Sequence, residues 1–238
     1  MRLSQFVLAL ILGIFSGNAS ALSLPQCVEA RDFPLHLNNC QASVTIYIKI
    51  SVMVIEKDGE STKEVESTLG GSGVIFSEDG YILTSAHVIS KSLPKIILVR
   101  YENREGEDQA VTAEIVQIDH TTGVDLALLK VSKHFFATVR LGREDELRYG
   151  DPVYIIGTPF GVLHHSFIKS YISNWDARDN TIMLGSGVSP GSSGGGVYNQ
   201  LGVLIGLMVS SNPISSYAIP IRTIRSFLSK SPFRDRLK

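Results

Sequence analysis

The sequence Ser189-Pro190-Gly191-Ser192-Ser193-Gly194-Gly195-Gly196 separates two apolar runs, at residues 181–188 and 197–207. Its glycines and its proline predict a tight turn that other groups approach closely. A serine hydroxyl at the centre of this turn would stand on a rigid corner among backbone N–H groups, as a nucleophile with an oxyanion hole requires. A flexible Gly/Ser loop between two strands has the same composition, so the rest of the chain must decide between the two interpretations.

A serine nucleophile needs a base, usually a neutral histidine that a carboxylate orients. All six histidines precede Ser193 in the chain: His36, His87, His120, His134, His164 and His165. Residues 191–195 also fit the G-x-S-x-G elbow of α/β-hydrolases, but in that fold the histidine follows the serine and a helix follows the elbow. Here no histidine follows, and the residues from 197 onward have the pattern of a strand. The elbow interpretation is therefore rejected.

His87 is the favoured base. It lies in the segment LTSAHVI at 83–89, at the end of an expected strand, where small residues leave its ring room to project. His120 is one alternative, and the adjacent pair His164 and His165 is another. The pair is a poor metal site, because neighbouring side chains in a strand point to opposite faces.

Asp125 is the favoured orienting carboxylate. It begins an apolar strand at 126–131, and an acid at the mouth of such a strand is costly unless it is paired. Asp119, six residues earlier, is the alternative.

The chain after residue 41 reads as a series of strands. Apolar side chains recur at every second position from 44 to 54, the period of a strand with one buried face, and Asp58-Gly59 predicts a hairpin turn. A polar strand to residue 69 leads through Gly-Gly-Ser-Gly into an apolar stretch. Further strands are expected at 74–76, 81–84, 95–100, 110–118, 125–131, 152–156, 166–173, 181–184, 197–198, 203–208 and 217–219.

Roughly six strands in each half predict an all-β protein of two small barrels. The charged residues 140–150 form the expected connector between them. Apolar side chains at helical spacing from residue 221 to 228 predict an amphipathic helix after Pro220.

The N-terminus has the pattern of a secretory signal peptide. Arg2 precedes an apolar run at 6–15, and Ala19-Ser20-Ala21 is a small-residue cleavage site, so residues 1–21 are expected to be removed. An uncleaved anchoring segment is the alternative. No later stretch is long and apolar enough to span a bilayer.

Export to an oxidising compartment favours a disulfide between Cys27 and Cys40, which would pin the N-terminal arm, residues 22–42. Free thiols are the alternative, and two cysteines without a nearby histidine pair do not complete a zinc site. We expect no metal and no cofactor. The net charge of −1 and the lack of a long basic block argue against nucleic acid as a partner.

Four motifs resemble, in the same order, those of trypsin-like serine proteases, and most closely those of the HtrA/Deg branch. They are GSGVIF with GYILTSAHV at 71–76 and 80–88, DLALLKV at 125–131, GDPV with IGTPFG at 150–153 and 156–161, and PGSSGG at 190–195. The resemblance covers about residues 70–224. It implies an all-β fold of two six-stranded antiparallel β-barrels with the site in the cleft between them, the first at 43–139 and the second, with the C-terminal helix, at 140–238.

The resemblance also implies the roles of the site residues. Ser193 would be the nucleophile, His87 the general base and then acid, and Asp125 the group that holds the histidine tautomer. The N–H groups of Gly191 and Ser193 would form the oxyanion hole. Ser192 is the nearest alternative nucleophile, but the motif places the reactive hydroxyl one residue later.

Substrate preference is bounded by the same resemblance. The residue six positions before the nucleophile, which lines the base of the first specificity pocket, is Gly187, so no acid is available to favour cleavage after Lys or Arg. Val188 and the segment Met208-Val209-Ser210 would shape the rest of the pocket, for a small or medium apolar residue.

Two features depart from the family pattern. We expect no PDZ domain after the protease, although one usually follows it in the HtrA/Deg branch, and Ser192 stands where asparagine is common. The sequence therefore predicts a secreted or periplasmic serine endopeptidase that acts on protein or peptide substrates, with an oligomer not indicated. The alternatives are a catalytically silent binding or chaperone module and an esterase on the same fold.

Overall fold

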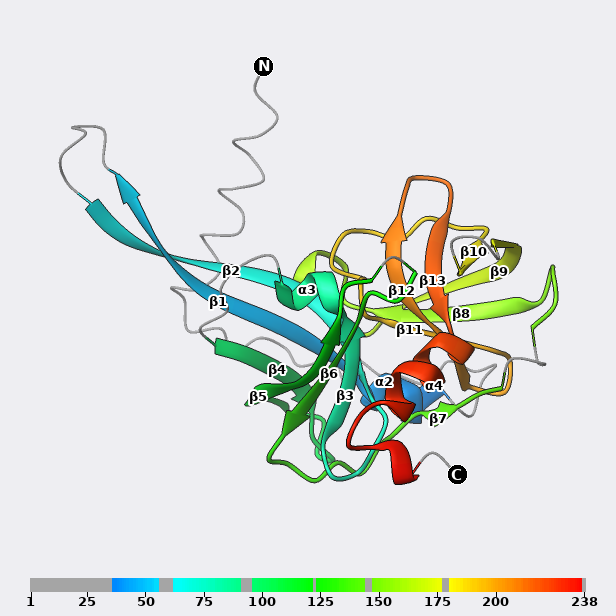
Figure 1. The fold of residues 1–238 in the computed structure, drawn as a ribbon, viewed down its shortest axis with the longest axis horizontal. Helices are drawn as coiled ribbons and strands as arrows, with labels where there is room; N and C mark the ends of the chain where they lie inside the picture. The colour runs from blue at the N-terminus through cyan, green and yellow to red at the C-terminus, as the bar shows by residue number, and fades with distance from the viewer. Residues whose placement is uncertain are drawn as a thin grey trace, which may run out of the picture.

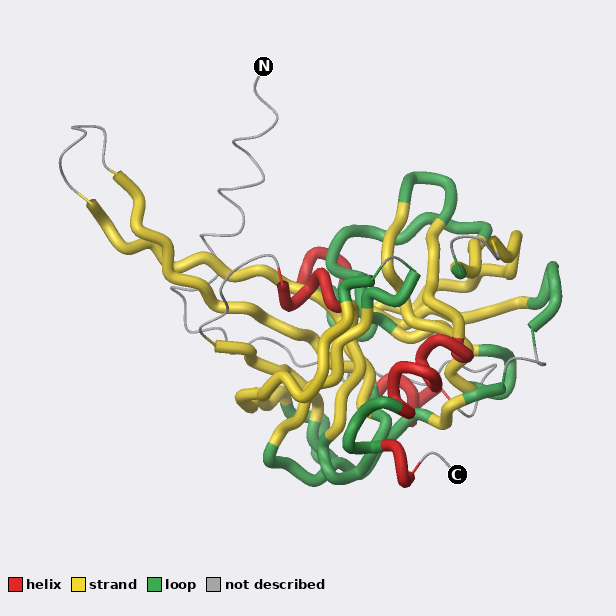
Figure 2. Tube along the Cα trace, in the orientation of Figure 1, coloured by secondary structure: helices red, strands yellow, loops and turns green. Residues whose placement is uncertain are grey.

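The computed structural model describes residues 36–55, 62–90, 96–121, 123–143, 147–176 and 180–236. Within them, two β-barrels lie side by side, and the long hairpin of the first two strands extends away from the body (Figure 1). Helices are few and short, and loops connect most of the strands (Figure 2).

The first barrel closes in the order β1-β2-β3-β6-β5-β4. Its strands are β1 (Ser43–Ile55), β2 (Thr62–Ile75), β3 (Tyr81–Ser85), β4 (Ile96–Glu102), β5 (Asp108–Asp119) and β6 (Leu126–Val131). The alternation that predicts β1 places Val44, Ile46 and Ile48 inside, each at most 1% exposed. The predicted first barrel is confirmed.

The second barrel is formed by β8 (Pro152–Gly157), β9 (Ser166–Asp176), β10 (Thr181–Leu184), β11 (Gly196–Tyr198), β12 (Val203–Ser211) and β13 (Ser216–Pro220). The pairing of β11 with β12 closes the order β11-β8-β9-β10-β13-β12. A two-residue strand, β7 (Arg140–Leu141), pairs in parallel with β12. The predicted second barrel is thus confirmed, while part of the expected connector at 140–150 joins its sheet.

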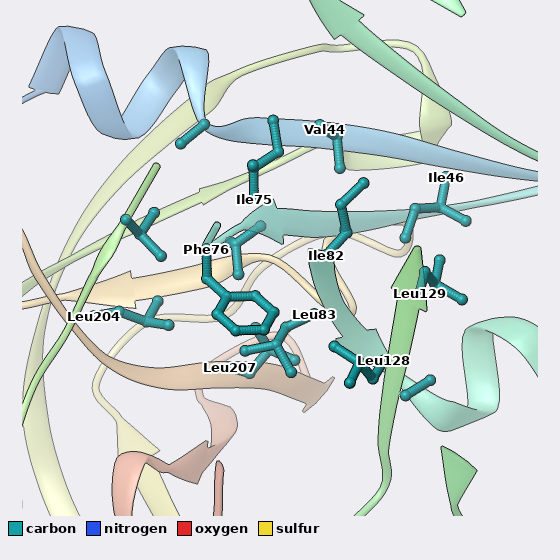
Figure 3. Close-up of a cluster of buried hydrophobic side chains, with 14 of the residues drawn as sticks. Val44, Ile46, Ile75, Phe76, Ile82, Leu83, Leu128, Leu129, Leu204 and Leu207 are labelled. Carbon is teal, nitrogen blue, oxygen red and sulfur yellow. The ribbon is translucent and has the colours of Figure 1, made fainter. Parts of the chain in front are cut away.

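The helices are α2 (His36–Gln41), α3 (Ala86–Ser90), α4 (Ile221–Ser229) and the short 3₁₀ turns η2 (Pro159–Gly161) and η3 (Arg234–Arg236). The predicted C-terminal helix is confirmed as α4, which begins directly after Pro220 and buries its apolar stripe. Leu204 and Leu207 of β12 join the core of the first barrel beside Phe76 and Leu83 (Figure 3). Each such buried side chain contributes roughly 1.5–3 kcal/mol, so this shared core holds the barrels together.

The glycine-rich stretch at 70–73 lies inside β2, where the sequence predicted a strand ending at 69. The reason is close packing against neighbouring elements. A Cβ on Gly71 would lie 2.5 Å from the side chain of Val88, and one on Gly73 would lie 2.9 Å from Ile46. The glycines therefore admit close neighbours to an unbroken strand.

Three predictions fall wholly or partly outside the described residues: the signal peptide at 1–21, most of the arm at 22–42, and the turn at Asp58-Gly59. Cys40 is buried in α2, but Cys27 lies outside the described residues, so the disulfide stays a prediction. Across the part of the chain that the structure describes, no helix has both the length and the apolar character that crossing a membrane requires.

His164 lies in the seam between the barrels, in the β8–β9 connection. Its Nε2 contacts the guanidinium of Arg100, which also pairs with Asp108. Because a guanidinium only donates hydrogen bonds, the ring proton sits on Nδ1, which donates to the Thr45 hydroxyl at 2.6 Å. Burial first, and then the positive charges of Arg100 and His165, lower the pKa of His164 to about 4, against an opposing effect of Asp108.

The partly buried His164 should make the protein less stable in mild acid. In the unfolded chain His164 binds a proton near its ordinary pKa of about 6.5, whereas the folded chain keeps it neutral, so stability falls as pH falls from 6.5 to 4. After allowance for partial exposure, we expect His164→Asn to reduce the loss of unfolding free energy over this range by about 1 kcal/mol. Urea unfolding of both proteins at several pH values measures it. An equal loss of unfolding free energy in the two proteins between pH 6.5 and 4 would contradict the prediction.

Candidate active site

His87 and Asp125 come together because of the register between β3 and β6. Ser85 pairs directly with Leu126, so the residues just beyond each strand meet at one edge of the barrel. The Nδ1 atom of His87 is 2.6 Å from Oδ2 of Asp125, and the backbone N–H of His87 donates to Oδ1 at 2.9 Å. This two-point contact fixes the ring and stabilises the tautomer with its proton on Nδ1.

The backbone at Asp125 is strained to achieve this contact. Its φ is +41°, a left-handed conformation that is uncommon outside glycine, although Asp and Asn adopt it more readily than other residues. Its carbonyl accepts from the Ala86 N–H at 3.0 Å, and its own N–H donates to Thr121 at 3.3 Å. Partners on both sides thus hold the residue in place.

Residues 189–196 form a corner, here called the nucleophile corner, in which each carbonyl from 190 to 193 accepts a hydrogen bond. The Pro190 carbonyl accepts from the Phe160 N–H at 2.6 Å, and the Ser192 carbonyl from the Gly195 N–H at 2.9 Å. The two remaining carbonyls, of residues 191 and 193, both accept from Ser72 of β2 at 2.8 Å. The orientations of the four peptide groups that carry these carbonyls are therefore set.

Two of the four N–H groups from 191 to 194 have no hydrogen-bond partner in the described part of the chain. Among the described residues, the N–H groups of Gly191 and Ser193 have no hydrogen-bond partner, whereas those of Ser192 and Gly194 donate to Ser189 and Met208. A trans peptide points its N–H away from its carbonyl, so the Gly191 N–H faces away from Phe160. Two free, fixed N–H donors, one on the candidate nucleophile Ser193 and one two residues before it, are the parts of an oxyanion hole.

Gly191 is required by this geometry. Its φ is +95°, and a Cβ there would lie 2.6 Å from the Thr158 carbonyl oxygen and 2.7 Å from the Phe160 nitrogen. Backbone thus approaches the corner closely, as the sequence predicted.

The nucleophile corner lies beside the strand that leads to His87. Gly194 packs so closely on β3 that a Cβ would lie 2.4 Å from the Thr84 hydroxyl, which places the corner beside the end of the strand that leads to His87. The Ser193 hydroxyl donates to the Val209 carbonyl at 3.2 Å. A hydroxyl has a single proton to donate, so in this conformation the Ser193 hydroxyl does not donate to His87. A rotation about the Cα–Cβ bond of Ser193 is needed to redirect that proton.

A cavity of about 230 Å³ opens beside Ser193. All seven lining residues are uncharged: Val188, Ser189, Pro190, Ser193, Met208, Ser210 and Ser211. Three of them belong to the predicted pocket, namely Val188, Met208 and Ser210. The other two predicted residues, Gly187 and Val209, are not among the lining residues.

The sequence analysis missed Ser189, Pro190 and Ser211 as lining residues. Ser189 and Pro190 directly precede the glycine turn, and this position next to the candidate nucleophile could have indicated that they line the cavity. Ser211 was missed because β12 runs on to residue 211 past an irregularity between residues 208 and 210. Its hydroxyl bonds both the N–H and the carbonyl of Val188, at 2.9 and 2.8 Å, and so joins the two walls of the cavity.

Residues 71–207 match the family model of the trypsin-like peptidase domain, which is more than half of the 238 residues. The chain belongs to the trypsin-like peptidase family. Relatives of the chain include a probable periplasmic serine endoprotease DegP-like of Pseudomonas putida, 35% identical over 158 residues, and one of Halomonas elongata, 39% identical over 142 residues. These matches cover 63% and 58% of the chain, but only 30% and 28% of the relatives.

Two solved structures similar to the chain are of HtrA-type or serine endoproteases. The HtrA-type protease AlgW with a decapeptide has a TM-score of 0.66 at 26% identity, over 82% of this chain and 66% of the other. The serine endoprotease from Yersinia pestis has a TM-score of 0.65 at 26% identity, over 85% and 65% of the two chains. The resemblance to the HtrA/Deg branch is therefore confirmed.

The alternative site residues predicted from the sequence are exposed, buried or held by other hydrogen bonds. His120 is exposed. Hydrogen bonds from the side chain of Thr121 and from its N–H, the latter at 2.8 Å, lower the pKa of Asp119. His164 is held in the seam between the barrels, and Ser192 is 2% exposed. The structure thus brings His87 and Asp125 into contact and places the nucleophile corner beside the end of β3.

Asp125→Asn should keep the fold and remove most of the reactivity of Ser193. Asparagine tolerates the left-handed backbone at this position, but its amide does not stabilise the charged ring that forms as the serine loses its proton. We expect the rate of Ser193 labelling by a fluorophosphonate to fall by about 10³–10⁴-fold. Circular dichroism is the control for folding, and a loss below about tenfold would contradict the assignment.

Proposed function

We propose that the chain is a serine endopeptidase that hydrolyses peptide bonds through Ser193, His87 and Asp125. The observation that carries this proposal is the nucleophile corner, in which every carbonyl from 190 to 193 is bonded while, of the N–H groups from 191 to 194, those of Gly191 and Ser193 have no partner among the described residues. The His87–Asp125 contact supports it from the facing edge of the first barrel.

The proposed reaction has two halves. His87 accepts the Ser193 proton as the hydroxyl attacks the scissile carbonyl, and Asp125 stabilises the imidazolium that forms. The N–H groups of Gly191 and Ser193 then hold the oxyanion, a contribution worth about 3–4 kcal/mol per donor in such sites. His87 returns the proton to the leaving amine, and water hydrolyses the acyl-enzyme by the same steps in reverse.

The proposed substrates are proteins or peptides with a small or medium apolar residue before the scissile bond. The uncharged cavity beside Ser193 supports this preference. Gly187 supports it as well, because a Cβ there would lie 2.3 Å from the Asn212 carbonyl oxygen, so the backbone of 212–213 occupies the space that an acidic side chain would need.

The proposed organisation is a signal peptide at 1–21, an arm at 22–42 pinned by a Cys27–Cys40 disulfide, and barrels at 43–139 and 140–238. The chain spans about 30% of the length of the curated relatives from Pseudomonas, so their whole activity and partners are not carried over. The names of these relatives, periplasmic serine endoproteases, support a periplasmic location.

The test of the endopeptidase proposal is labelling and cleavage by the wild-type protein beside Ser193→Ala. The wild type should react with a fluorophosphonate and cleave unfolded casein, and Ser193→Ala should do neither. A wild type that is inert in both assays would point to the binding module, an interpretation that the Ser193–Val209 hydrogen bond favours. Casein cleavage that survives in Ser193→Ala would reject the nucleophile, and ester hydrolysis without peptide cleavage would indicate an esterase.

Cleavage preference is tested separately with a peptide library read by mass spectrometry. We expect Val, Ala, Leu or Met before the scissile bond, at least tenfold above Lys or Arg, because one buried uncompensated charge outweighs a methylene in a pocket. A profile dominated by Arg would contradict the pocket assignment.

A further inference from the structure

Two hydroxyl side chains of the first barrel reach into the second. Thr45 and Ser72 are directly paired across β1 and β2, so their side chains lie on the same face of the hairpin. Both are buried, at 2% and 0% exposure. Both bond Thr158, which follows β8 of the second barrel.

Ser72 makes four hydrogen bonds, and two of them hold the nucleophile corner. Its Oγ donates to the Gly191 carbonyl, and its backbone N–H donates to the Ser193 carbonyl, both at 2.8 Å. Its Oγ also accepts from the Thr158 N–H at 2.8 Å, and its carbonyl accepts from the Thr84 hydroxyl at 2.7 Å. One residue thus fixes the carbonyls on both sides of Ser192.

Thr45 supports the same arrangement from one step further away. Its hydroxyl accepts from His164 and therefore donates its single proton to the Thr158 hydroxyl, at 2.8 Å. Thr158 begins the segment 158–161, whose Phe160 N–H holds the Pro190 carbonyl. Ser72 thus fixes the peptide group after Gly191 directly. Ser72 and Thr45 together fix the peptide group before Gly191 through the segment 158–161.

We propose that Ser72 is a positioning residue for the oxyanion hole, assisted by Thr45. The inference rests on the proposed function and adds to it a requirement on the first barrel, which contributes more than His87 and Asp125. Without the Ser72 hydroxyl, the Gly191 carbonyl and the Thr158 N–H lose their buried partner. Gly191, whose conformational freedom is large, then turns its N–H away from the oxyanion.

The test compares Ser72→Ala, Ser72→Cys and Thr45→Val with wild type on a peptide p-nitroanilide ending in Val. Loss of one oxyanion donor costs about 10²–10³-fold in kcat, and a donor that is only misplaced part of the time should cost about 10–10²-fold. We expect this loss in Ser72→Ala with KM nearly unchanged, a smaller loss in Thr45→Val, and an intermediate one in Ser72→Cys, which keeps a weak donor. The Ki of a peptidyl trifluoromethyl ketone, which forms an oxyanion on Ser193, should rise in proportion to the loss of kcat/KM.

Ser85→Ala is the matched control. Ser85 is also buried and also donates across the barrels, to the Met208 carbonyl at 2.8 Å, but that carbonyl keeps the Gly194 N–H as a second partner. We expect its kcat to stay within about twofold of wild type, since the carbonyl is not left unpaired. Equal losses in Ser85→Ala and Ser72→Ala would show a general effect of cavities and overturn the proposal.

Hydrogen exchange separates this proposal from the proposed function. The Ser192 and Gly194 N–H groups, which are bonded inside the corner, should exchange at least tenfold faster in Ser72→Ala and at the wild-type rate in Ser85→Ala. A wild type that neither labels nor cleaves rejects the endopeptidase, and exchange then still decides the role of Ser72. Unchanged exchange in Ser72→Ala, or unchanged kcat and Ki in an active enzyme, overturns the positioning role.

Discussion

The peptide groups of residues 190–193 depend on hydrogen bonds from outside their own loop. Ser72 of the first barrel bonds the carbonyls of Gly191 and Ser193, and the Phe160 N–H from the β8–β9 connection bonds that of Pro190. Catalytic donors lower a barrier only when they are aimed before the reaction begins. The packing of one barrel on the other therefore sets the electrostatics of the candidate site, as well as the stability of the fold.

The facing half of the site follows from strand register. The pairing of Ser85 with Leu126 brings His87 and Asp125 to one edge of the barrel, although they lie 38 positions apart in the chain. The carboxylate reaches the ring at the cost of a left-handed backbone at Asp125, and strain of this kind is typical of functional positions. A stable barrel thus holds a locally unfavourable residue where the chemistry needs it.

Side chains and backbone both contribute to the walls of the cavity beside Ser193. Ser211 joins the two walls through both polar groups of Val188, and Gly187 lets the backbone of residues 212–213 approach within contact. The cavity of about 230 Å³ has no charged residue among its lining. The proposed selectivity for apolar residues rests on the absence of a partner for a buried charge.

The sequence by itself determined the strands, the C-terminal helix and the candidate residues Ser193, His87 and Asp125. Strand periodicity, glycine placement and the order of the motifs are local patterns, and local patterns survive in one dimension. Only the tertiary structure decided that β2 continues through its glycines, that β7 joins the second sheet, and that Ser72 holds the nucleophile corner. The hydrogen bond from Ser72 to Gly191 joins residues 119 positions apart. Such a contact depends on how two closed barrels pack, and no periodic pattern in the sequence indicates it.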